Sequence, residues 1–233
     1  MKPVYSLIIF AVAFFSCNPK LSSGLRKHDL KKDVLIETNM GSMVVRLSDS
    51  TPLHRDNFLK LVKQHFYDSI LFHRVINHFM IQAGDPNSKM APAGKMLGDG
   101  DPSYTIPAEF RPSLFHKKGV IAAARTGDDI NPLKASSGSQ FYIVQGKVFT
   151  DAGLDSVETY RLKGRKLPAA HRAVYKNLGG TPHLDQNYTV FGELVSGFDV
   201  LDSIAAVPTS GRQGGDRPLQ DVRILKMRLI KRK

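Results

Sequence analysis

The sequence is short of the residues on which most covalent enzymes depend. It contains one cysteine among 233 residues, so no disulfide can form within the chain. Its most distinctive stretch, FHRVINHFMIQAGD over 72–85, lacks the paired carboxylates, the cysteine and the Ser-His pattern that hydrolytic chemistry uses. Its one long hydrophobic run, near the start, is too short to span a bilayer. These shortages point away from hydrolases and from disulfide-stabilised folds.

Negative charge is scarce as well. The 21 acidic residues stand against 33 Lys and Arg, which leaves a formal net charge of +12. Such a balance fits nucleic acid, an anionic membrane surface or simple solubility. The basic residues are spread along the chain, with dense runs only in RKHDLKK near the start and KRK at the end. No aromatic residues interleave with them as in single-strand-binding proteins, so we expect a solvated basic surface and no nucleic-acid partner.

The first residues have the pattern of an export signal. Lys2 gives a short positive region, LIIFAVAFF is an apolar region, and small Ser16 precedes Cys17. FFSC resembles a bacterial lipobox, in which the cysteine is lipidated and the chain is cut before it; ordinary secretion with a cut nearby is the alternative. We therefore expect a signal peptide over 1–16, a lipid anchor on Cys17, and a flexible tether over 17–32. This predicts an exported lipoprotein that faces the periplasm.

The remaining chain, 33–233, is long enough for one sizeable core, and its pattern is mainly β. Short apolar runs are separated by turn residues, and only two framework helices are predicted, one beginning at Pro52 and one after Gly197. This pattern favours a closed β-barrel. The expected strands cover 33–38, 43–47, 70–76, 78–84, 119–125, 139–145, 188–195 and 222–230.

One segment departs from the strand pattern. From about 148 to 180 the sequence becomes helical, with Ala170, Val174 and Leu178 at a spacing of four residues and glycines after them. We interpret 148–180 as a helical insertion in a loop of the barrel, because about thirty residues cannot bury a core of their own. Since the insertion leads straight into His183 and Leu184, we expect it to lie beside a functional groove.

Four motifs in order carry a family resemblance: FHRVINHFMIQAGD, GVIAAARTG, SGSQFYIV and HLDQNYTVFGELVSGFDVLDSI. Over about 33–230, apart from the insertion, the chain resembles the cyclophilin family of peptidyl-prolyl cis-trans isomerases. The resemblance implies a closed eight-stranded antiparallel barrel capped by two helices, with the substrate groove on its outer face. The run GGTPHLD and the insertion look like the form found in Bacteroidetes-type bacterial lipoproteins.

The resemblance also implies site residues. Arg74 matches the family's catalytic arginine. The residues implied to bind substrate are Phe79, Met80, Gln82, Ala124, Arg125, Gln140, Tyr142, His183, Leu184 and Tyr188. Several positions depart from the usual pattern. His183 replaces a rim aromatic, and Tyr142 replaces a phenylalanine at the pocket floor. Tyr188 stands where histidine is common, and Arg125 where eukaryotic members have asparagine. Ala123 replaces a methionine, which we expect to leave space beside the groove.

One cation and an apolar clamp suit this chemistry, because rotating an X-Pro bond breaks no covalent bond and needs no cofactor or metal. His73 and His78 do not suggest a metal site, since alternation along a strand would put them on opposite faces. We therefore expect a monomeric isomerase that acts on proline-containing segments of unfolded or exported proteins. The alternative is a proline-peptide-binding chaperone or scaffold module of the same fold with little catalysis.

Overall fold

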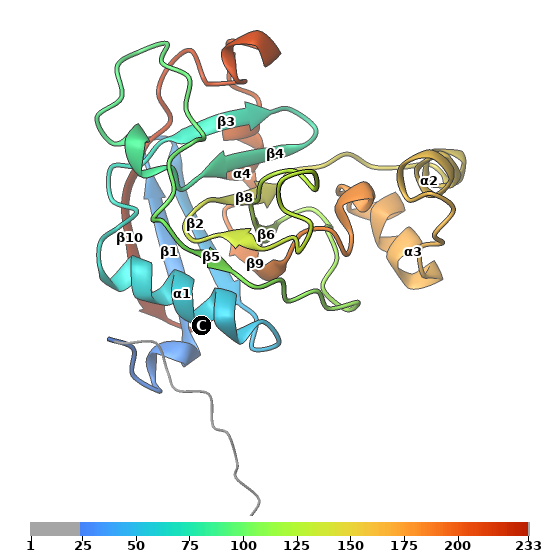
Figure 1. Cartoon of the computed structure of the whole chain (residues 1–233), viewed down its shortest axis with the longest axis horizontal. Helices are drawn as coiled ribbons and strands as arrows, with labels where there is room; N and C mark the ends of the chain where they lie inside the picture. Colours follow the sequence, from blue (N-terminus) through green and yellow to red (C-terminus); the bar gives the residue numbers. More distant parts are fainter. Residues whose placement is uncertain (1–23, 233) are drawn as a thin grey trace, which may run out of the picture.

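Alternating apolar residues build the central sheet. A computed structural model describes residues 24–232 of the chain (Figure 1). In β1 (Lys32–Thr38) and β2 (Gly41–Leu47), every second side chain is buried inside the sheet, and the two strands pair antiparallel. The remaining strands are β3 (Phe72–Ile76), β4 (Met80–Ala83), β5 (Thr105–Ile106), β6 (Val120–Ala123), β7 (Ser136–Ser137), β8 (Phe141–Val144), β9 (Val190–Ser196) and β10 (Ile224–Lys231).

Eight of these strands form one curled antiparallel sheet in the order β10-β1-β2-β9-β6-β8-β4-β3, while β5 and β7 pair separately. The expected mainly β, eight-stranded antiparallel fold is confirmed, but the sheet is open where a closed barrel was expected. Its edges meet at one isolated bridge, Leu71 to Arg223. Beyond it β3 bulges between Phe72 and Arg74, and the Val75 N–H bonds to the Asp216 carbonyl instead of to β10.

Two helices cover the sheet, as expected. The helix α1 (Pro52–Lys63) buries Phe58, Leu59 and Val62 against the main core, and α4 (Phe198–Ala205) buries Leu201 and Ile204. Since the apolar faces of both helices meet the inner face of the sheet, the core is contiguous. Short helical turns lie at η1 (Asp29–Lys31), η2 (Pro86–Ser88), η4 (Pro182–Leu184) and η5 (Arg212–Gly214).

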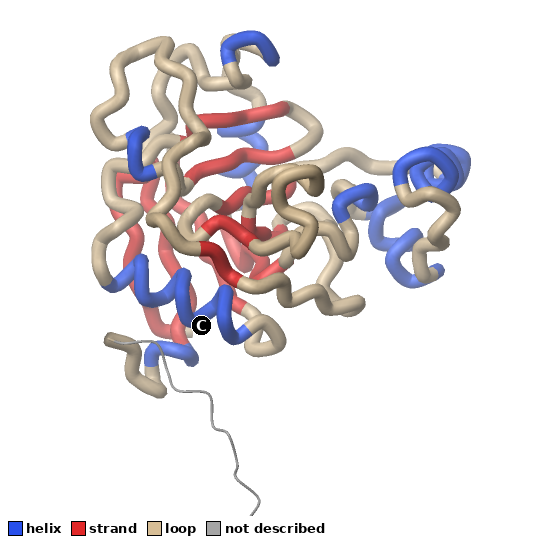
Figure 2. Tube along the Cα trace, in the orientation of Figure 1, coloured by secondary structure: helices blue, strands red, loops and turns tan. Residues whose placement is uncertain are grey.

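The insertion is helical, as the sequence predicts, and Figure 2 shows its helices gathered at one side, away from the sheet. It contains α2 (Asp151–Ser156), a π-helical turn η3 (Val157–Arg161) and α3 (Ala169–Asn177). The predicted apolar face of α3 is wrong, because Ala170 and Leu178 are exposed whereas Tyr175 is fully buried. The reason is that Tyr175 packs with Leu154, Leu162 and Leu167 against Phe115, a residue of the barrel portion of the chain.

The structure describes residues 24–32, the second part of the segment 17–32 expected as a tether. Residues 24–32 pack on the domain: Leu25 and Leu30 contact the core, and Asp29 is buried and bonded by the Lys63 ammonium group at 2.7 Å. The expected signal peptide, 1–16, and Cys17 lie outside the described residues. Within 24–232, no helix has both the length and the apolar character needed to cross a membrane.

Candidate active site

A pocket of about 150 Å³ opens on the outer face of the sheet, over β4, β6 and β8. All nine residues that line it are among the eleven expected at the site. They are Arg74, Phe79, Met80, Gln82, Ala124, Arg125, Tyr142, Leu184 and Tyr188. His183 lies beside this lining, and Gln140 lines a neighbouring cavity of about 280 Å³ that shares Gln82, Ala124 and Arg125.

The bulge in β3 directs Arg74 outward. Phe72 and Val75 point into the core, and Arg74 pairs with Gln82 of β4 on the outer face. Its Nη1 donates to Gln82 Oε1 at 3.4 Å, and its Nε lies 3.5 Å from Asp216 Oδ2. Both contacts are long, and a guanidinium has five N–H donors in a fixed fork. The head, whose side chain is 41 % exposed, therefore keeps donors for a bound molecule.

Gln82 and Gln140 form a second link behind Arg74. The Gln82 Nε2 donates to Gln140 Oε1 at 3.1 Å, and the Gln140 Nε2 donates to the carbonyl oxygens of Gly98 and Gly100, each at 2.7 Å. Gln140 therefore anchors the loop beside the pocket instead of lining the pocket itself. Gln82, which touches both Arg74 and the pocket, is oriented by this chain of amides.

The pocket floor is Tyr142 of β8. Its hydroxyl does not protrude into an apolar space, because it bonds to the Nε2 of His116 at 3.0 Å. Burial raises the pKa of the Tyr142 phenol well above its usual range, so the group stays neutral. Nothing in the sequence singles out His116, which lies in the loop before β6 and is fully buried. No spacing rule links two side chains 26 residues apart on separate elements.

One wall of the pocket is aromatic and apolar. The rings of Phe79 and His183 stack with centroids 5.7 Å apart, and Leu184 continues the wall down to the floor. Burial, with Arg161 nearby, lowers the pKa of His183 to about 4, so the imidazole is neutral at physiological pH. A neutral ring stacked on Phe79 can serve as the rim aromatic that the family pattern places there.

The resemblance implies that the backbones of Ala124 and Arg125 hold the substrate, and the opposite wall departs from this at Ala124. The Ala124 N–H donates to the Gln140 carbonyl and the Ala124 carbonyl accepts from the Ser137 N–H, so both groups are already used within the protein. The Arg125 side chain lies over the Tyr188 ring at 4.5 Å and is only 4 % exposed, although the residue as a whole is half-buried. The accessible part of Arg125 is therefore its backbone.

The expectation that Ala123 leaves space beside the pocket is wrong. Side chains alternate along β6, and Ala123 points into the main core with Phe141, whereas Ala122 points toward Tyr142. The expectation placed Ala123 on the wrong face of the strand. A smaller residue at 123 therefore changes core packing rather than the shape of the pocket.

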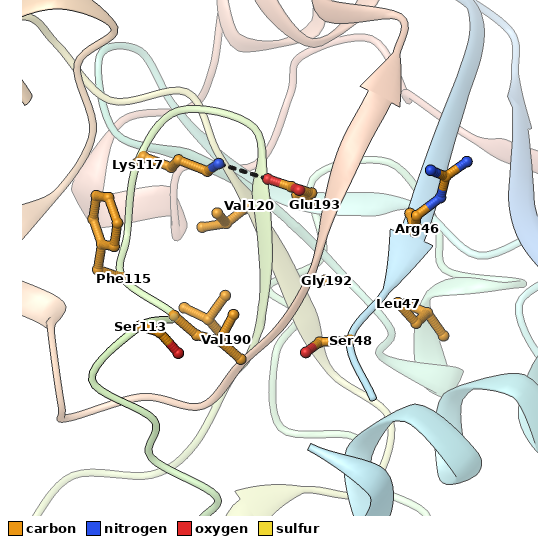
Figure 3. Close-up of a pocket in the computed structure, with 11 residues that line it drawn as sticks. Arg46, Leu47, Ser48, Ser113, Phe115, Lys117, Val120, Val190, Gly192 and Glu193 are labelled. Atoms are coloured by element: carbon orange, nitrogen blue, oxygen red, sulfur yellow. Dashed lines mark ion pairs between the residues drawn. The ribbon is translucent and has the colours of Figure 1, made fainter. Parts of the chain in front are cut away.

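A larger cavity of about 310 Å³ lies over β2 and β9 (Figure 3). Figure 3 shows Arg46 and Leu47 on one side of the hollow and Phe115 on the other. Its cations are paired: Lys117 with Glu193 at 2.7 Å and Arg46 with Asp33 at 2.8 Å. Such pairing makes it a poorer match for the expected chemistry than the pocket beside Arg74.

The described part of the chain contains no cluster of side chains that could bind a metal ion. Between residues 24 and 232, no three His, Cys, Asp or Glu side chains lie close enough to hold an ion. His73 is buried and His78 lies in an exposed turn, so the two imidazoles do not converge.

Comparison with known proteins gives the same picture over nearly the whole domain. The family model described as cyclophilin type peptidyl-prolyl cis-trans isomerase/CLD matches residues 33–229. A protein of Staphylococcus haemolyticus, named for peptidyl-prolyl cis-trans isomerase activity, is 34 % identical over 205 residues, which cover 88 % of this chain and 93 % of the relative. A Staphylococcus aureus relative of the same name is 35 % identical with the same coverage.

A further relative and a solved structure extend the comparison. A Streptococcus pyogenes protein named as a bifunctional phosphatase/peptidyl-prolyl cis-trans isomerase is 38 % identical over 192 residues, and this chain spans 37 % of its length. The crystal structure of a Cryptosporidium parvum cyclophilin, 22 % identical, superposes with a TM-score of 0.61 over 87 % of this chain and 99 % of that one, which shows the shared fold. The family model and the relatives show that the chain belongs to the cyclophilin type peptidyl-prolyl cis-trans isomerase family.

Proposed function

We propose that this chain accelerates the cis-trans isomerisation of X-Pro peptide bonds, with Arg74 acting on the amide nitrogen. The observation that carries this proposal is a guanidinium with donors to spare beside an apolar pocket of about 150 Å³. The pocket is large enough for a five-membered ring. The family to which the chain belongs is named for the same activity.

The chemistry asks for little more than this. The barrier to rotation, about 20 kcal/mol, comes from delocalisation of the nitrogen lone pair into the carbonyl group. In the twisted amide the nitrogen becomes pyramidal and basic, so a donor aimed at it binds the transition state more strongly than the planar ground state. Arg74 suits this role because its guanidinium stays charged and holds its donors in a fork.

The remaining lining would hold the substrate while the bond turns. Phe79, Met80, Tyr142 and Leu184 would enclose the pyrrolidine ring, and Gln82 and the Arg125 backbone would hold neighbouring peptide groups. A Cryptosporidium cyclophilin of the same fold was crystallised in the presence of the dipeptide Ala-Pro, which supports a proline-containing substrate.

The size of the required effect is modest. Spontaneous exchange takes tens to hundreds of seconds, and an ordinary turnover is about 10 to 1000 per second, so the acceleration is about 10³ to 10⁵. This corresponds to roughly 4 to 7 kcal/mol of preferential transition-state stabilisation. One charge-assisted hydrogen bond together with orientation of the peptide can supply it.

A protease-coupled assay with an Ala-Ala-Pro-Phe chromogenic peptide tests the proposal. Wild type should accelerate the slow phase, and Arg74→Ala should lower kcat/KM by about 10²- to 10³-fold, because one preorganised donor is lost. Equal rates for wild type, Arg74→Ala and buffer would refute isomerase activity. If wild type were inactive yet suppressed aggregation of an unfolded client, the proline-binding chaperone or scaffold function would replace it; His183 and Tyr142, which depart from the family pattern, are the features that favour that alternative.

We also propose that the enzyme is exported and assists folding of exported proteins, anchored through a lipid on Cys17 and acting as a monomer. The support is the signal-like start of the sequence and the lipobox-like FFSC. Expression in a Gram-negative host should place wild type in the membrane fraction and Cys17→Ala in the soluble periplasmic fraction. Identical fractionation of the two proteins would exclude the lipid anchor.

A further inference from the structure

A chain of buried hydrogen bonds connects the insertion to the floor of the pocket. The Tyr175 hydroxyl of α3 donates to Asp185 Oδ2 at 2.8 Å. Asp185 Oδ1 lies 3.0 Å from His116 Nδ1, and His116 Nε2 lies 3.0 Å from the Tyr142 hydroxyl. None of the four residues is more than 4 % exposed. The chain therefore runs from a surface module to the substrate pocket without passing through water.

The proton positions along this chain follow from Asp185. A carboxylate only accepts hydrogen bonds, so the His116 Nδ1–H must donate to it, which leaves Nε2 directed at the phenol. The His116 backbone N–H also donates to Asp185 Oδ1, at 2.8 Å. Asp185 thus fixes both the tautomer and the orientation of the imidazole that meets Tyr142.

Tyr175 holds Asp185 in turn. Both donors from His116 fall on Oδ1, and the donor that the structure shows on Oδ2 is the Tyr175 hydroxyl. Burying a carboxylate with one oxygen unsatisfied is unfavourable, so without that hydroxyl the group would turn toward other donors. Turning it would break the bonds from His116, because all three donors depend on one carboxylate orientation.

The position of Tyr142 sets the depth of the pocket. Its ring lies within 16° of parallel to the His116 ring, with centroids 6.1 Å apart, and is nearly perpendicular to the Tyr188 ring at 5.9 Å. Both Tyr142 and Tyr188 line the pocket. A tilt of the Tyr142 ring after loss of the His116 bond would therefore change the space available to the proline ring.

We propose that Tyr175 is a positioning residue for isomerisation, acting through Asp185 and His116 on Tyr142. The inference rests on the proposed isomerase function and gives the insertion a role in it: the helix α3 supplies the hydroxyl that keeps the pocket floor in place. The insertion therefore supports the pocket floor through Tyr142, while Arg74 acts on the substrate directly.

A double-mutant cycle on the whole chain tests the proposal, with the Ala-Ala-Pro-Phe peptide as substrate. Tyr175→Phe keeps the buried ring and removes only the hydroxyl, and it should lower kcat/KM about 3- to 10-fold, mainly through KM. In a Tyr142→Phe background the same change should have less than about a 1.5-fold effect, because the group through which it acts is absent. Tyr160→Phe, which removes a hydroxyl from an 80 % exposed tyrosine of the same insertion, is the matched control and should equal wild type.

The outcomes separate the two proposals. Isomerisation by wild type together with equal losses from Tyr175→Phe in both backgrounds, or with no loss in either, would overturn the positioning role alone. A wild type that neither isomerises the peptide nor binds it in a titration would overturn the proposed function and this inference together. If wild type binds the peptide without catalysing its isomerisation, the double-mutant cycle is measured on the dissociation constant instead. The effects of Tyr175→Phe and Tyr142→Phe should again be non-additive, and additive effects would overturn the positioning role.

Discussion

At the scale of single residues, the guanidinium of Arg74 differs from those of Arg46 and Arg55 in the length of its contacts. Its partners Gln82 and Asp216 lie 3.4 and 3.5 Å away, whereas Arg46 and Arg55 have acidic partners within 3 Å. Loose partners orient a side chain without consuming its donors, and that combination is what a reaction with a transient acceptor needs.

Arg74→Lys separates charge from geometry at this position. Lysine keeps the positive charge but lacks the planar fork, so we expect kcat/KM to fall by about 10²-fold with the free energy of unfolding nearly unchanged. The protease-coupled assay measures the first quantity and urea denaturation the second. Arg228→Lys, at an exposed β10 position paired with Glu37, is the control and should equal wild type in both. Full activity of Arg74→Lys would show that charge alone suffices.

His73 should make the fold sensitive to acid. Its imidazole is 2 % exposed, neither ring nitrogen has a well-formed hydrogen-bond partner, and burial lowers its pKa to about 4 from the usual 6.5. Between these values the unfolded chain takes up a proton that the folded chain does not, so stability falls as the pH drops from about 6.5 to about 4. The full difference is about 3 kcal/mol.

His73→Phe should remove this part of the pH dependence. We expect the difference in unfolding free energy between pH 7 and pH 4, measured by urea denaturation, to shrink by about 3 kcal/mol. His73→Gln should flatten the profile equally without the gain in apolar packing, which separates titration from polarity. A variant profile that keeps the wild-type slope would mean that other groups carry the acid response.

Much of the candidate site could be predicted residue by residue, and the misses have physical causes. The motif resemblance supplied all nine residues that line the pocket. Strand geometry accounts for four of them, because Arg74, Met80, Gln82 and Tyr142 lie on the outer face of β3, β4 and β8. Ala123 was assigned to the wrong face, and the Ala124 backbone is consumed by Gln140 and Ser137. His116 and Tyr175 were missed because their contacts join parts of the chain that no local pattern relates.

At the scale of elements, the root of the insertion is its most constrained point. The chain leaves the barrel at Lys147 and returns at Gly180, and the two residues form a backbone bridge. Gly180 has φ +149°, and a Cβ there would lie 2.2 Å from the His116 carbonyl oxygen and 2.7 Å from the Tyr175 ring. The return of the chain therefore requires glycine and lies against two members of the buried hydrogen-bond chain.

Gly180→Ala should lower the free energy of unfolding more than Gly164→Ala does. Gly164 also has positive φ, +88°, but a Cβ there meets nothing within 4 Å, so we expect a loss of about 1 kcal/mol from backbone strain alone. At Gly180 overpacking adds about 1–3 kcal/mol to the strain, and kcat/KM should fall too, because His116 is displaced. Urea denaturation and the peptide assay measure both. Equal losses for the two variants would show that the close contacts relax freely.

The faces of elements proved harder to predict than the elements themselves. The helical character of 148–180 was evident from the sequence, yet α3 turns Tyr175 inward in place of Ala170 and Leu178. The surface that decides this is Phe115, which is distant in sequence. The opening of the sheet had no sequence signal either, since a bulge and one loop hydrogen bond at Val75 cause it.

At the scale of the whole molecule, the first described residues belong to the domain. Lys63 of α1 donates to Asp29 and to the Gly24 carbonyl, each at 2.7 Å, and the Arg232 guanidinium donates to the Leu30 carbonyl at 3.1 Å. This segment ties the start of the domain to α1 and to the end of β10. A boundary at residue 33, which the sequence suggests, would cut through it.

Truncation tests where the domain begins. A chain that starts at residue 24 keeps the segment, whereas one that starts at residue 33 loses the partly buried Leu25 and Leu30 and the buried Asp29. We expect the shorter chain to be less stable by about 2–3 kcal/mol, roughly 1 kcal/mol for each half-buried leucine plus the lost hydrogen bonds. Thermal melting of the two chains measures the difference in stability. Their kcat/KM values, measured well below the melting temperatures, should be equal. Equal melting temperatures would mean that the segment contributes no stability.

The narrow neck at Lys147 and Gly180 bears on how such a domain can diversify. The same few backbone bonds hold both ends of the neck. The segment between Lys147 and Gly180 can therefore be exchanged, lengthened or redesigned without shifting the strands beside Arg74. If Tyr175 has the proposed positioning role, one condition limits that freedom: a replacement that keeps the full kcat/KM has to supply a hydrogen-bond donor to Asp185 in place of the Tyr175 hydroxyl. If residues 148–179 are replaced by a library of segments and variants are selected for turnover alone, the selected segments should repeatedly place a hydrogen-bond donor next to Asp185.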